Sequence, residues 1–128
     1  MTAVTKCYPG RSGSGSGDRV PSRKEQSLCR PYLAEEIALI DPALIIPVGR
    51  LAIGLFYPTG LALEEIIGTQ IQADAVRADT VRPYQVVPLP HPSGASRWHQ
   101  IPDNRQRIQQ AVVLIGGHVE EIRAFWSR

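Results

Sequence analysis

The sequence is short of the features that mark membrane, disulfide-rich and strongly charged proteins. Its 128 residues include two cysteines, too few for the disulfide framework of a small secreted domain. A formal net charge of +2 gives no electrostatic argument for nucleic-acid binding. No apolar run approaches the roughly 20 residues of a membrane-spanning helix, and the first residues show no signal-peptide pattern. We expect one cytoplasmic domain over residues 1–128, with no membrane partner.

Two catalytic signatures are absent as well. No Gly-x-x-x-x-Gly-Lys-Ser/Thr stretch is present, which excludes a nucleoside-triphosphate site of that kind. The Gly-x-Ser-x-Gly elbow of the α/β-hydrolases is also missing. The hydrophobic share of 43% and the charged share of 20% are those of an ordinary globular domain.

Apolar stretches predict three core strands, around Val4, Ile46 and Val86. The runs at residues 44–49 and 84–89 are uncharged, which is typical of strands buried in a parallel sheet. Residues 69–79 are expected to form a hairpin or an irregular edge, and helices are expected at residues 22–40, 50–56, 61–67 and 100–115. This alternation predicts an α/β fold, a three-layer α/β/α sandwich with a small, mainly parallel central sheet.

The helix expected at residues 22–40 has a clear start. Ser22 can cap it, and Glu25 three residues later completes a capping box. Pro31 predicts a kink or a break near residues 28–30. The apolar spacing places Cys29 on the buried side of this helix.

A proline-rich loop carries the clearest chemical signal. Leu-Pro-His-Pro-Ser-Gly, at residues 89–94, follows the third predicted strand, and its prolines cannot donate ladder hydrogen bonds. His91 is therefore expected just beyond the carboxyl end of a strand, where open parallel sheets bind ligands. The alternative is a plain turn whose histidine satisfies a carbonyl group.

This loop, followed by Arg97 and Trp98, resembles the second active-site motif of the uracil-DNA glycosylase superfamily, with the nearest match to its bacterial and archaeal iron–sulfur members. Residues 4–10 resemble the strand and loop before the family's third cluster cysteine, residues 18–33 its next helix, and residues 44–52 its central strand and turn. The resemblance implies base-excision repair: hydrolysis of the N-glycosidic bond of a uracil flipped out of single- or double-stranded DNA.

The resemblance also assigns roles to the loop residues. His91 would contact the uracil oxygen at which negative charge develops. Pro92, Ser93 and Gly94 would grip the phosphate beside the lesion. Arg97, with Trp98, would lie at the gap that the extruded base leaves, and a plain phosphate contact by Arg97 is the alternative.

Residues 10–19 form the one low-complexity stretch, in which glycine and serine alternate. We expect a flexible loop there. Arg19 and the loop amides could follow a phosphate backbone, since such contacts are independent of base sequence. A plain solvated linker is the alternative.

The chain departs from the family's pattern near its start. It has no counterpart of the first active-site motif, which positions the attacking water, nor of the aromatic that stacks on the flipped base. Ala3 stands where the family often has an asparagine for the uracil edge, and alanine cannot make those hydrogen bonds. We therefore expect an N-terminally truncated domain.

Cys7 and Cys29 match, by the same resemblance, the second pair of ligands of a four-iron, four-sulfur (4Fe-4S) cluster. Such a cluster needs four thiolates, and this chain supplies two. We expect half of an iron–sulfur site, filled in a full-length parent and without a cluster in this chain alone. Two small buried apolar side chains are the alternative.

Two other functions stay open. One is a catalytically inactive DNA-binding fragment or remnant of the family, which would bind uracil-containing DNA without releasing the base. The other is an unrelated small α/β hydrolase or transferase that uses His91 as a base. A nucleophilic Ser93 would then need an acid partner among Asp74, Asp79 and Asp103, and DNA would not compete with its substrate.

Overall fold

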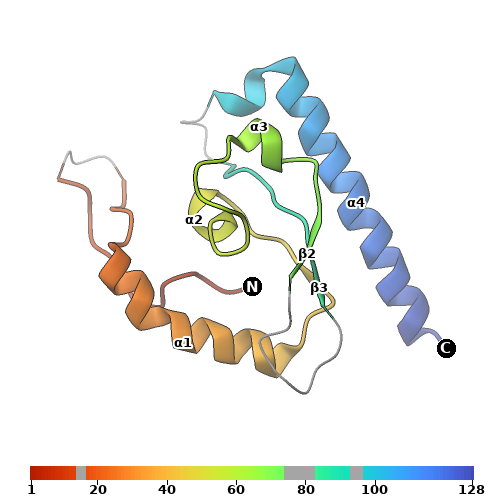
Figure 1. Cartoon of the computed structure of the whole chain (residues 1–128), viewed down its shortest axis with the longest axis horizontal. Coiled ribbons are helices and arrows are strands. Elements are labelled where there is room, and N and C mark those ends of the chain that lie inside the picture. Colours follow the sequence, from red (N-terminus) through yellow and green to blue (C-terminus); the bar gives the residue numbers. More distant parts are fainter. Residues whose placement is uncertain (14–16, 74–82, 93–96) are drawn as a thin grey trace. The chain divides into compact units, whose positions relative to one another are not determined.

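The computed structural model describes residues 1–13, 17–73, 83–92 and 97–128, and divides into two compact units, Met1–Asp41 and Pro42–Arg128 (Figure 1). The first unit is built on one helix and the second on a sheet. No helix in the described part of the chain is long and apolar enough to cross a membrane.

The N-terminal unit is built on α1 (Arg23–Ile40), and its predicted capping box is present. The Glu25 amide donates to the Ser22 hydroxyl at 3.3 Å, and the Ser22 amide donates to the Glu25 carboxylate at 2.7 Å. The predicted break near residues 28–30 does not occur, because α1 continues through Pro31 as one helix of 18 residues. A proline within a helix removes one backbone hydrogen bond, which the remaining turns of α1 tolerate.

The strand predicted around Val4 is wrong. Residues 1–9 contain no strand, and side chains from this segment bond to α1 instead. The Lys6 ammonium lies 2.6 Å from the Glu36 carboxylate, which also accepts a hydrogen bond from the Thr2 hydroxyl. A short apolar run without a strand to pair with gains nothing from extended pairing, so side-chain contacts decide its course.

The C-terminal unit contains a three-stranded sheet of order β1-β3-β2. Its strands are β1 (Leu44–Ile45), β2 (Ile71–Ala73) and β3 (Tyr84–Val86). The pairing of β1 with β3 is parallel and that of β2 with β3 is antiparallel. The strands predicted around Ile46 and Val86 are confirmed, and β2 is the edge element expected within residues 69–79. The α/β class is confirmed.

The parallel pairing continues beyond the assigned strands. Every second amide from Gln85 to Leu89 donates to a carbonyl of segment 43–47, at 3.0–3.1 Å, and an isolated bridge joins the two segments further on. Pro88 falls between two donating positions and Pro90 lies beyond the last of them, so their missing N–H groups cost this ladder nothing.

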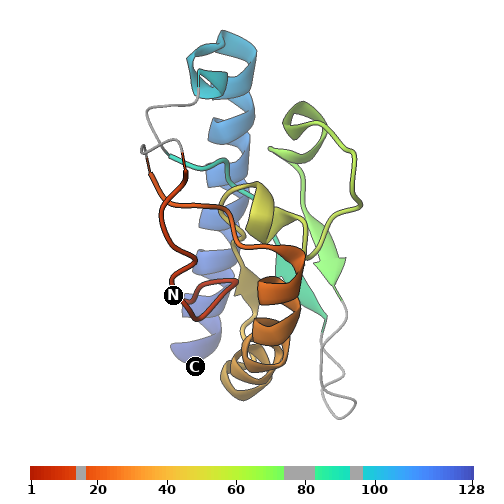
Figure 2. The ribbon, with the colours of Figure 1, turned by 90° about the vertical axis from the view of Figure 1, so that its left-hand side faces the viewer.

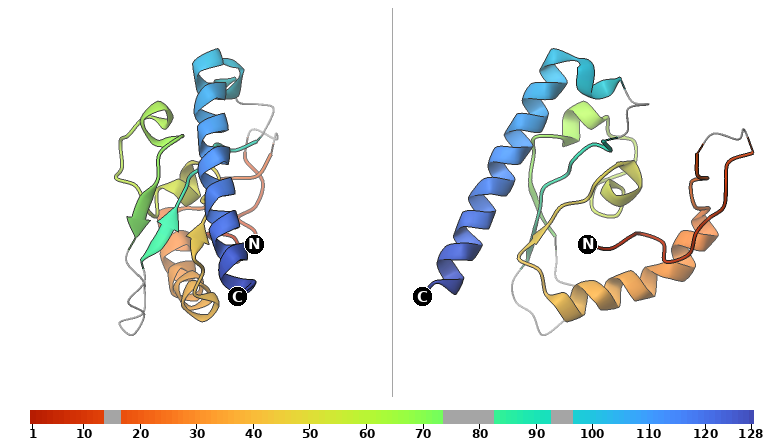
Figure 3. Two further views of the ribbon diagram at one scale, coloured as in Figure 1. Left: turned by 90° about the vertical axis from the view of Figure 1, so that its right-hand side faces the viewer. Right: turned by 180° about the vertical axis from the view of Figure 1, so that it is seen from behind.

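Helices cover both faces of the sheet. α4 (Pro102–Trp126) lies along one face and α2 (Arg50–Ile53) on the other, which gives three layers within this unit (Figures 1 and 3). The remaining helices are α3 (Leu63–Ile66) and the 3-10 turn η1 (Trp98–Gln100). α2 and α3 are shorter than predicted, whereas α4 is one unbroken helix of 25 residues (Figure 2).

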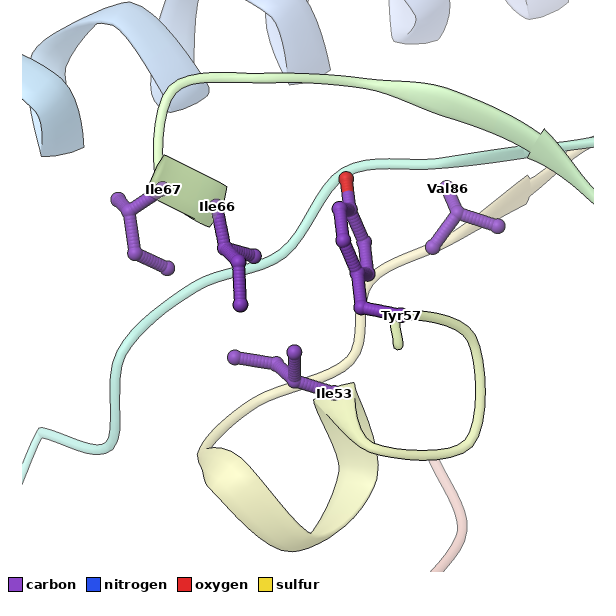
Figure 4. Close-up of a cluster of buried hydrophobic side chains, with 5 residues drawn as sticks. All are labelled: Ile53, Tyr57, Ile66, Ile67 and Val86. Atoms are coloured by element: carbon purple, nitrogen blue, oxygen red, sulfur yellow. The ribbon is translucent and has the colours of Figure 1, made fainter. Parts of the chain in front are cut away.

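A compact apolar cluster joins these layers. Figure 4 shows its side chains converging from α2, α3, β3 and the residues that follow the two helices; they are Ile53, Tyr57, Ile66, Ile67 and Val86. The Tyr57 hydroxyl lies 3.1 Å from the Thr69 hydroxyl, so its polar end is satisfied. Complete burial of one such aliphatic side chain contributes about 1.5–3 kcal/mol. This cluster fixes α2 against the sheet, and with it the turn that follows β1.

Candidate functional site

His91 lies beyond β3 and packs on the backbone of Gly49, where the segment that follows β1 ends. A Cβ atom added to Gly49 would lie 3.3 Å from the His91 Cβ and 3.4 Å from the His91 Cδ2. The Gly49 amide donates to the Leu89 carbonyl at 2.9 Å, two residues before the histidine. The imidazole therefore stands at the carboxyl ends of two parallel segments, as the sequence predicted.

Glycine is required at position 49 for two reasons. Its φ of 81° and ψ of 161° lie in a region that is essentially restricted to glycine. The close approach of the His91 side chain also means that a Cβ atom at this position would push the histidine aside by a few tenths of an ångström. Sequence reasoning missed this contact, because it joins residues 42 positions apart; the only signal was a glycine directly after a predicted buried strand.

The side chains of His91 and Pro92 are exposed, so a ligand can reach the loop from solvent. Ser93 and Gly94, the other two predicted phosphate contacts, lie outside the described residues. So do Asp74 and Asp79, two of the three acid partners of the alternative hydrolase mechanism. The third, Asp103, lies in the first turn of α4.

The far side of the loop is anchored through Trp98. The Trp98 indole N–H donates to the Glu64 carboxylate at 2.5 Å, and its ring packs against the apolar cluster. The Asn104 side chain, itself only 3% exposed, donates to the Trp98 carbonyl at 3.0 Å. Trp98 is therefore held against the fold, whereas the neighbouring Arg97 is exposed.

Glu64 is suited to this anchoring role. Hydrogen bonds from its own backbone amide and from the Trp98 indole lower the pKa of its carboxyl group, and Asn104 and Arg107 lower it further. An ionised carboxyl group acts only as an acceptor, and hydrogen bonds to a charged acceptor are stronger than those between neutral groups. Glu64 therefore stays an acceptor across the neutral range and holds the loop's anchor in place.

The remaining predicted DNA contacts lie in the N-terminal unit. Arg19 forms a two-pronged ion pair with Glu25, with N–O distances of 3.0 and 2.7 Å, and also donates to the Pro9 carbonyl at 2.5 Å. This pairing occupies much of its donor capacity, and its predicted phosphate contact stays a prediction. Ala3 is exposed and lies outside any strand.

The flanks of the glycine-serine stretch are paired. The Ser12 amide donates to the Gly17 carbonyl at 3.0 Å, and the Arg19 amide donates to the Gly10 carbonyl at 2.9 Å. Residues 14–16 lie outside the described residues, and the flexibility expected of the stretch stays a prediction.

The two cysteines do not complete a metal centre. Both are free thiols; Cys29 is 8% exposed, as predicted for the inner side of α1, and Cys7 is exposed. The Lys6 amide donates to the Cys29 sulfur at 3.4 Å. Within the described residues no group of three or more His, Cys, Asp and Glu could hold a metal ion. Two thiolates do not fit a 4Fe-4S cluster, which takes four.

Together these observations define an α/β domain whose candidate site is a histidine loop at the carboxyl ends of two parallel segments. The family model of the Uracil DNA glycosylase superfamily matches residues 1–118, and the chain belongs to that superfamily. Its members act on DNA. A comparison with curated proteins gives no match. The family match includes His91, Arg97 and both cysteines, and ends within α4.

Proposed function

We propose that the chain is a uracil-DNA glycosylase domain, which hydrolyses the N-glycosidic bond of a uracil flipped out of DNA. The observation that carries the proposal is the exposed His91 imidazole, set on Gly49 at the carboxyl ends of two parallel segments. Membership of the superfamily supports it independently.

The chemistry follows from where charge develops. When the N-glycosidic bond breaks, its electron pair leaves with the base, and negative charge accumulates on the uracil oxygens. A donor placed at such an oxygen stabilises the transition state more than the ground state, which lowers the barrier. In this domain His91 is that donor. Gly49 lets its ring lie against the backbone, and this contact restricts its orientation before the base arrives.

Other residues hold the DNA. Pro92, Ser93 and Gly94 follow His91 in the chain, so we propose that they contact the phosphate beside the flipped nucleotide. Arg97 stands exposed beside the anchored Trp98 and contacts the strand at the gap or at a phosphate. The strand itself is single- or double-stranded DNA, and flipping costs least when the base is already unpaired.

The attacking group is a water molecule. The sequence has no counterpart of the motif that positions this water in related enzymes, so the assistance that His91 gives to the departing base is the main contribution we assign to this chain. Removal of one oxyanion-type donor typically costs about 10²–10³-fold in rate. We expect a loss of that size for His91→Ala.

The test is uracil release from a single-stranded, uracil-containing oligonucleotide. The assay compares the wild-type chain with His91→Ala and His91→Gln. The control is His99→Ala, which removes a different imidazole and keeps the His99 backbone carbonyl, to which Arg105 donates at 3.2 Å. Release that falls in His91→Ala, recovers partly in His91→Gln and is unchanged in His99→Ala supports the proposal.

Two results would contradict it. Retained binding of uracil-containing DNA with no release by the wild-type chain would favour the inactive DNA-binding remnant. Absence of DNA binding altogether would contradict the assignment of uracil-containing DNA as the substrate. Parallel assays on a duplex substrate report which form of DNA the domain prefers.

We further propose that a 4Fe-4S cluster forms only when two more thiolates are supplied from outside this chain, beside Cys7 and Cys29. No step of the mechanism above depends on such a cluster. Iron and sulfide analysis after anaerobic reconstitution tests this proposal. Stoichiometric cluster on the isolated chain, lost in Cys29→Ala, would contradict it.

A further inference from the structure

A hollow of about 490 Å³ lies at the end of the sheet opposite His91. Ala43 and Pro83, which precede β1 and β3, line it, whereas His91 follows the carboxyl ends of those strands. The other wall is the last part of α4, which runs past this end of the sheet in Figures 1 and 3. The other lining residues are Gln72, Gln85, His118, Glu121, Ile122, Phe125 and Trp126.

Two amides form the polar side of the hollow. Gln72 and Gln85 are directly opposite each other in the antiparallel pairing of β2 with β3, so their side chains leave the same face of the sheet. Each amide offers both a donor and an acceptor. A pair of neighbouring amides can therefore match the edge of a planar heterocycle that carries donors and acceptors side by side.

Two aromatic side chains form the apolar side. Phe125 and Trp126 lie in the last turn of α4 and make an edge-to-face contact, with ring centroids 5.9 Å apart. They are 68% and 80% exposed, so both rings can be reached from solvent. Rings held by each other in this way offer a preformed surface for stacking.

His118 fixes the rim of the hollow. One of its ring nitrogens lies 3.0 Å from the Gln70 side-chain oxygen, and the other lies 3.4 Å from the Glu121 carboxylate. Both nitrogens are therefore engaged within the fold. His118 ties the last turns of α4 to residue 70, next to β2, and so keeps the aromatic wall beside the amides.

This site lies partly outside the part of the chain that matches the family. The superfamily match ends at residue 118, and Ile122, Phe125 and Trp126 lie beyond it. The proposed glycosylase chemistry uses none of the residues that line the hollow.

We propose that this hollow binds a nucleobase, stacked on Trp126 with its hydrogen-bonding edge on Gln72 and Gln85. Ligand pockets are typically about 300–1,000 Å³, so its volume has room for one base with its sugar. Base–aromatic stacking is tolerant of base identity, because every base has a π-face. The base comes either from a single strand of DNA or from a free nucleotide, and the two sources share this chemistry.

The experiment measures three ligands on the full chain: a short oligothymidylate, an abasic oligonucleotide of equal length, and thymidine monophosphate. Trp126→Ala and Gln85→Leu are compared with Val113→Ala, an exposed position on α4 that does not line the hollow. Loss of one stacked base weakens binding by about 5- to 150-fold. We expect that loss in Trp126→Ala, a smaller loss in Gln85→Leu, and none in Val113→Ala.

Dependence of oligothymidylate binding on Trp126 identifies the base of a strand as the ligand. Dependence seen only with thymidine monophosphate identifies a free nucleotide. Equal binding of both thymidine ligands by wild type and Trp126→Ala would overturn the proposal, and so would an equal loss of affinity for the abasic oligonucleotide. Circular dichroism confirms that each variant retains its helix content. His91→Ala serves as a separate arm: because it leaves the hollow intact, failure of uracil release does not affect this test.

Discussion

Gly49→Ala is the substitution that best tests the geometry of the site. It adds one methyl group at the point where the imidazole of His91 rests on the backbone. The added Cβ would lie 3.3 Å from the His91 Cβ, closer than ordinary van der Waals contact. The backbone at φ 81° and ψ 161° would also have to hold an alanine in a region that only glycine occupies without strain.

The expected magnitude follows from these two effects. A residue held in such a sparsely populated region costs of the order of 1–3 kcal/mol, so we expect a fall of that size in the free energy of unfolding. The chain relieves the contact by moving the His91 ring away. Because misplacement of a catalytic group by about 1 Å can cost about 10²-fold, the rate of uracil release should fall by up to that factor.

Urea denaturation measures the first effect, and the single-stranded uracil-release assay measures the second. Gly116→Ala is the matched control, since Gly116 lies within α4 and a Cβ there would meet no atom within 4 Å. This control should gain about 0.5–1 kcal/mol, because alanine favours the helix interior over glycine, and should keep its activity. Unchanged stability and unchanged release in Gly49→Ala would refute the placement of His91.

Three further predictions concern local interactions. Ser22→Ala removes the hydroxyl cap of α1 and should lower the free energy of unfolding by about 0.5–2 kcal/mol, measured by thermal melts followed by circular dichroism. Hydrogen bonds from Arg19 and then from Ser22 lower the pKa of Glu25 to about 2, so the stability from this group is complete above its ordinary pKa of 4.5 and is lost as the pH falls towards 2. An NMR titration of the Glu25 carboxyl should show that value, and an ordinary pKa there would contradict the ion pair. Glu64→Gln replaces a charged acceptor with a neutral one and should shift the indole N–H resonance of Trp98; an unchanged resonance would contradict the contact.

Local sequence signals predicted the elements that depend on local chemistry. Helix α1 begins at the predicted capping box of Ser22 and Glu25. Strands β1 and β3 lie within the predicted uncharged runs at residues 44–49 and 84–89. These predictions hold because capping and burial act within a few residues. The strand around Val4 failed because a strand exists only with a partner. That partner is not visible in the sequence of the segment itself.

The end of α4 was misplaced for a related reason. The closing helix was expected to stop at residue 115, and the helix continues through Gly116 and Gly117 to Trp126. Glycine costs about 1 kcal/mol in a helix interior, which a helix of 25 residues can absorb. Packing beyond the glycines, including the His118 contacts, keeps the last turns in place.

The site was predicted in part. The histidine loop was visible because prolines and a preceding strand give a local pattern. Two contacts of the site were not predicted: His91 packs on Gly49, and Trp98 is held by Glu64 and Asn104. Most of these contacts join residues that are far apart in the sequence, and no pattern in a single sequence reveals them.

The last hydrogen bond of the parallel pairing, between Gly49 and Leu89, has a consequence for hydrogen exchange and for heat inactivation. The Gly49 N–H···O Leu89 bond, 2.9 Å long, closes the ladder just where His91 rests on Gly49. Ends of ladders open more often than their centres, by local fluctuations that leave the rest of the fold intact. Each time this hydrogen bond opens, the His91 imidazole loses its contact with Gly49. The Gly49 amide should therefore exchange with solvent faster than the amides of Gln85 and Val87 within the same ladder, and catalytic competence should fade on warming before the sheet itself melts.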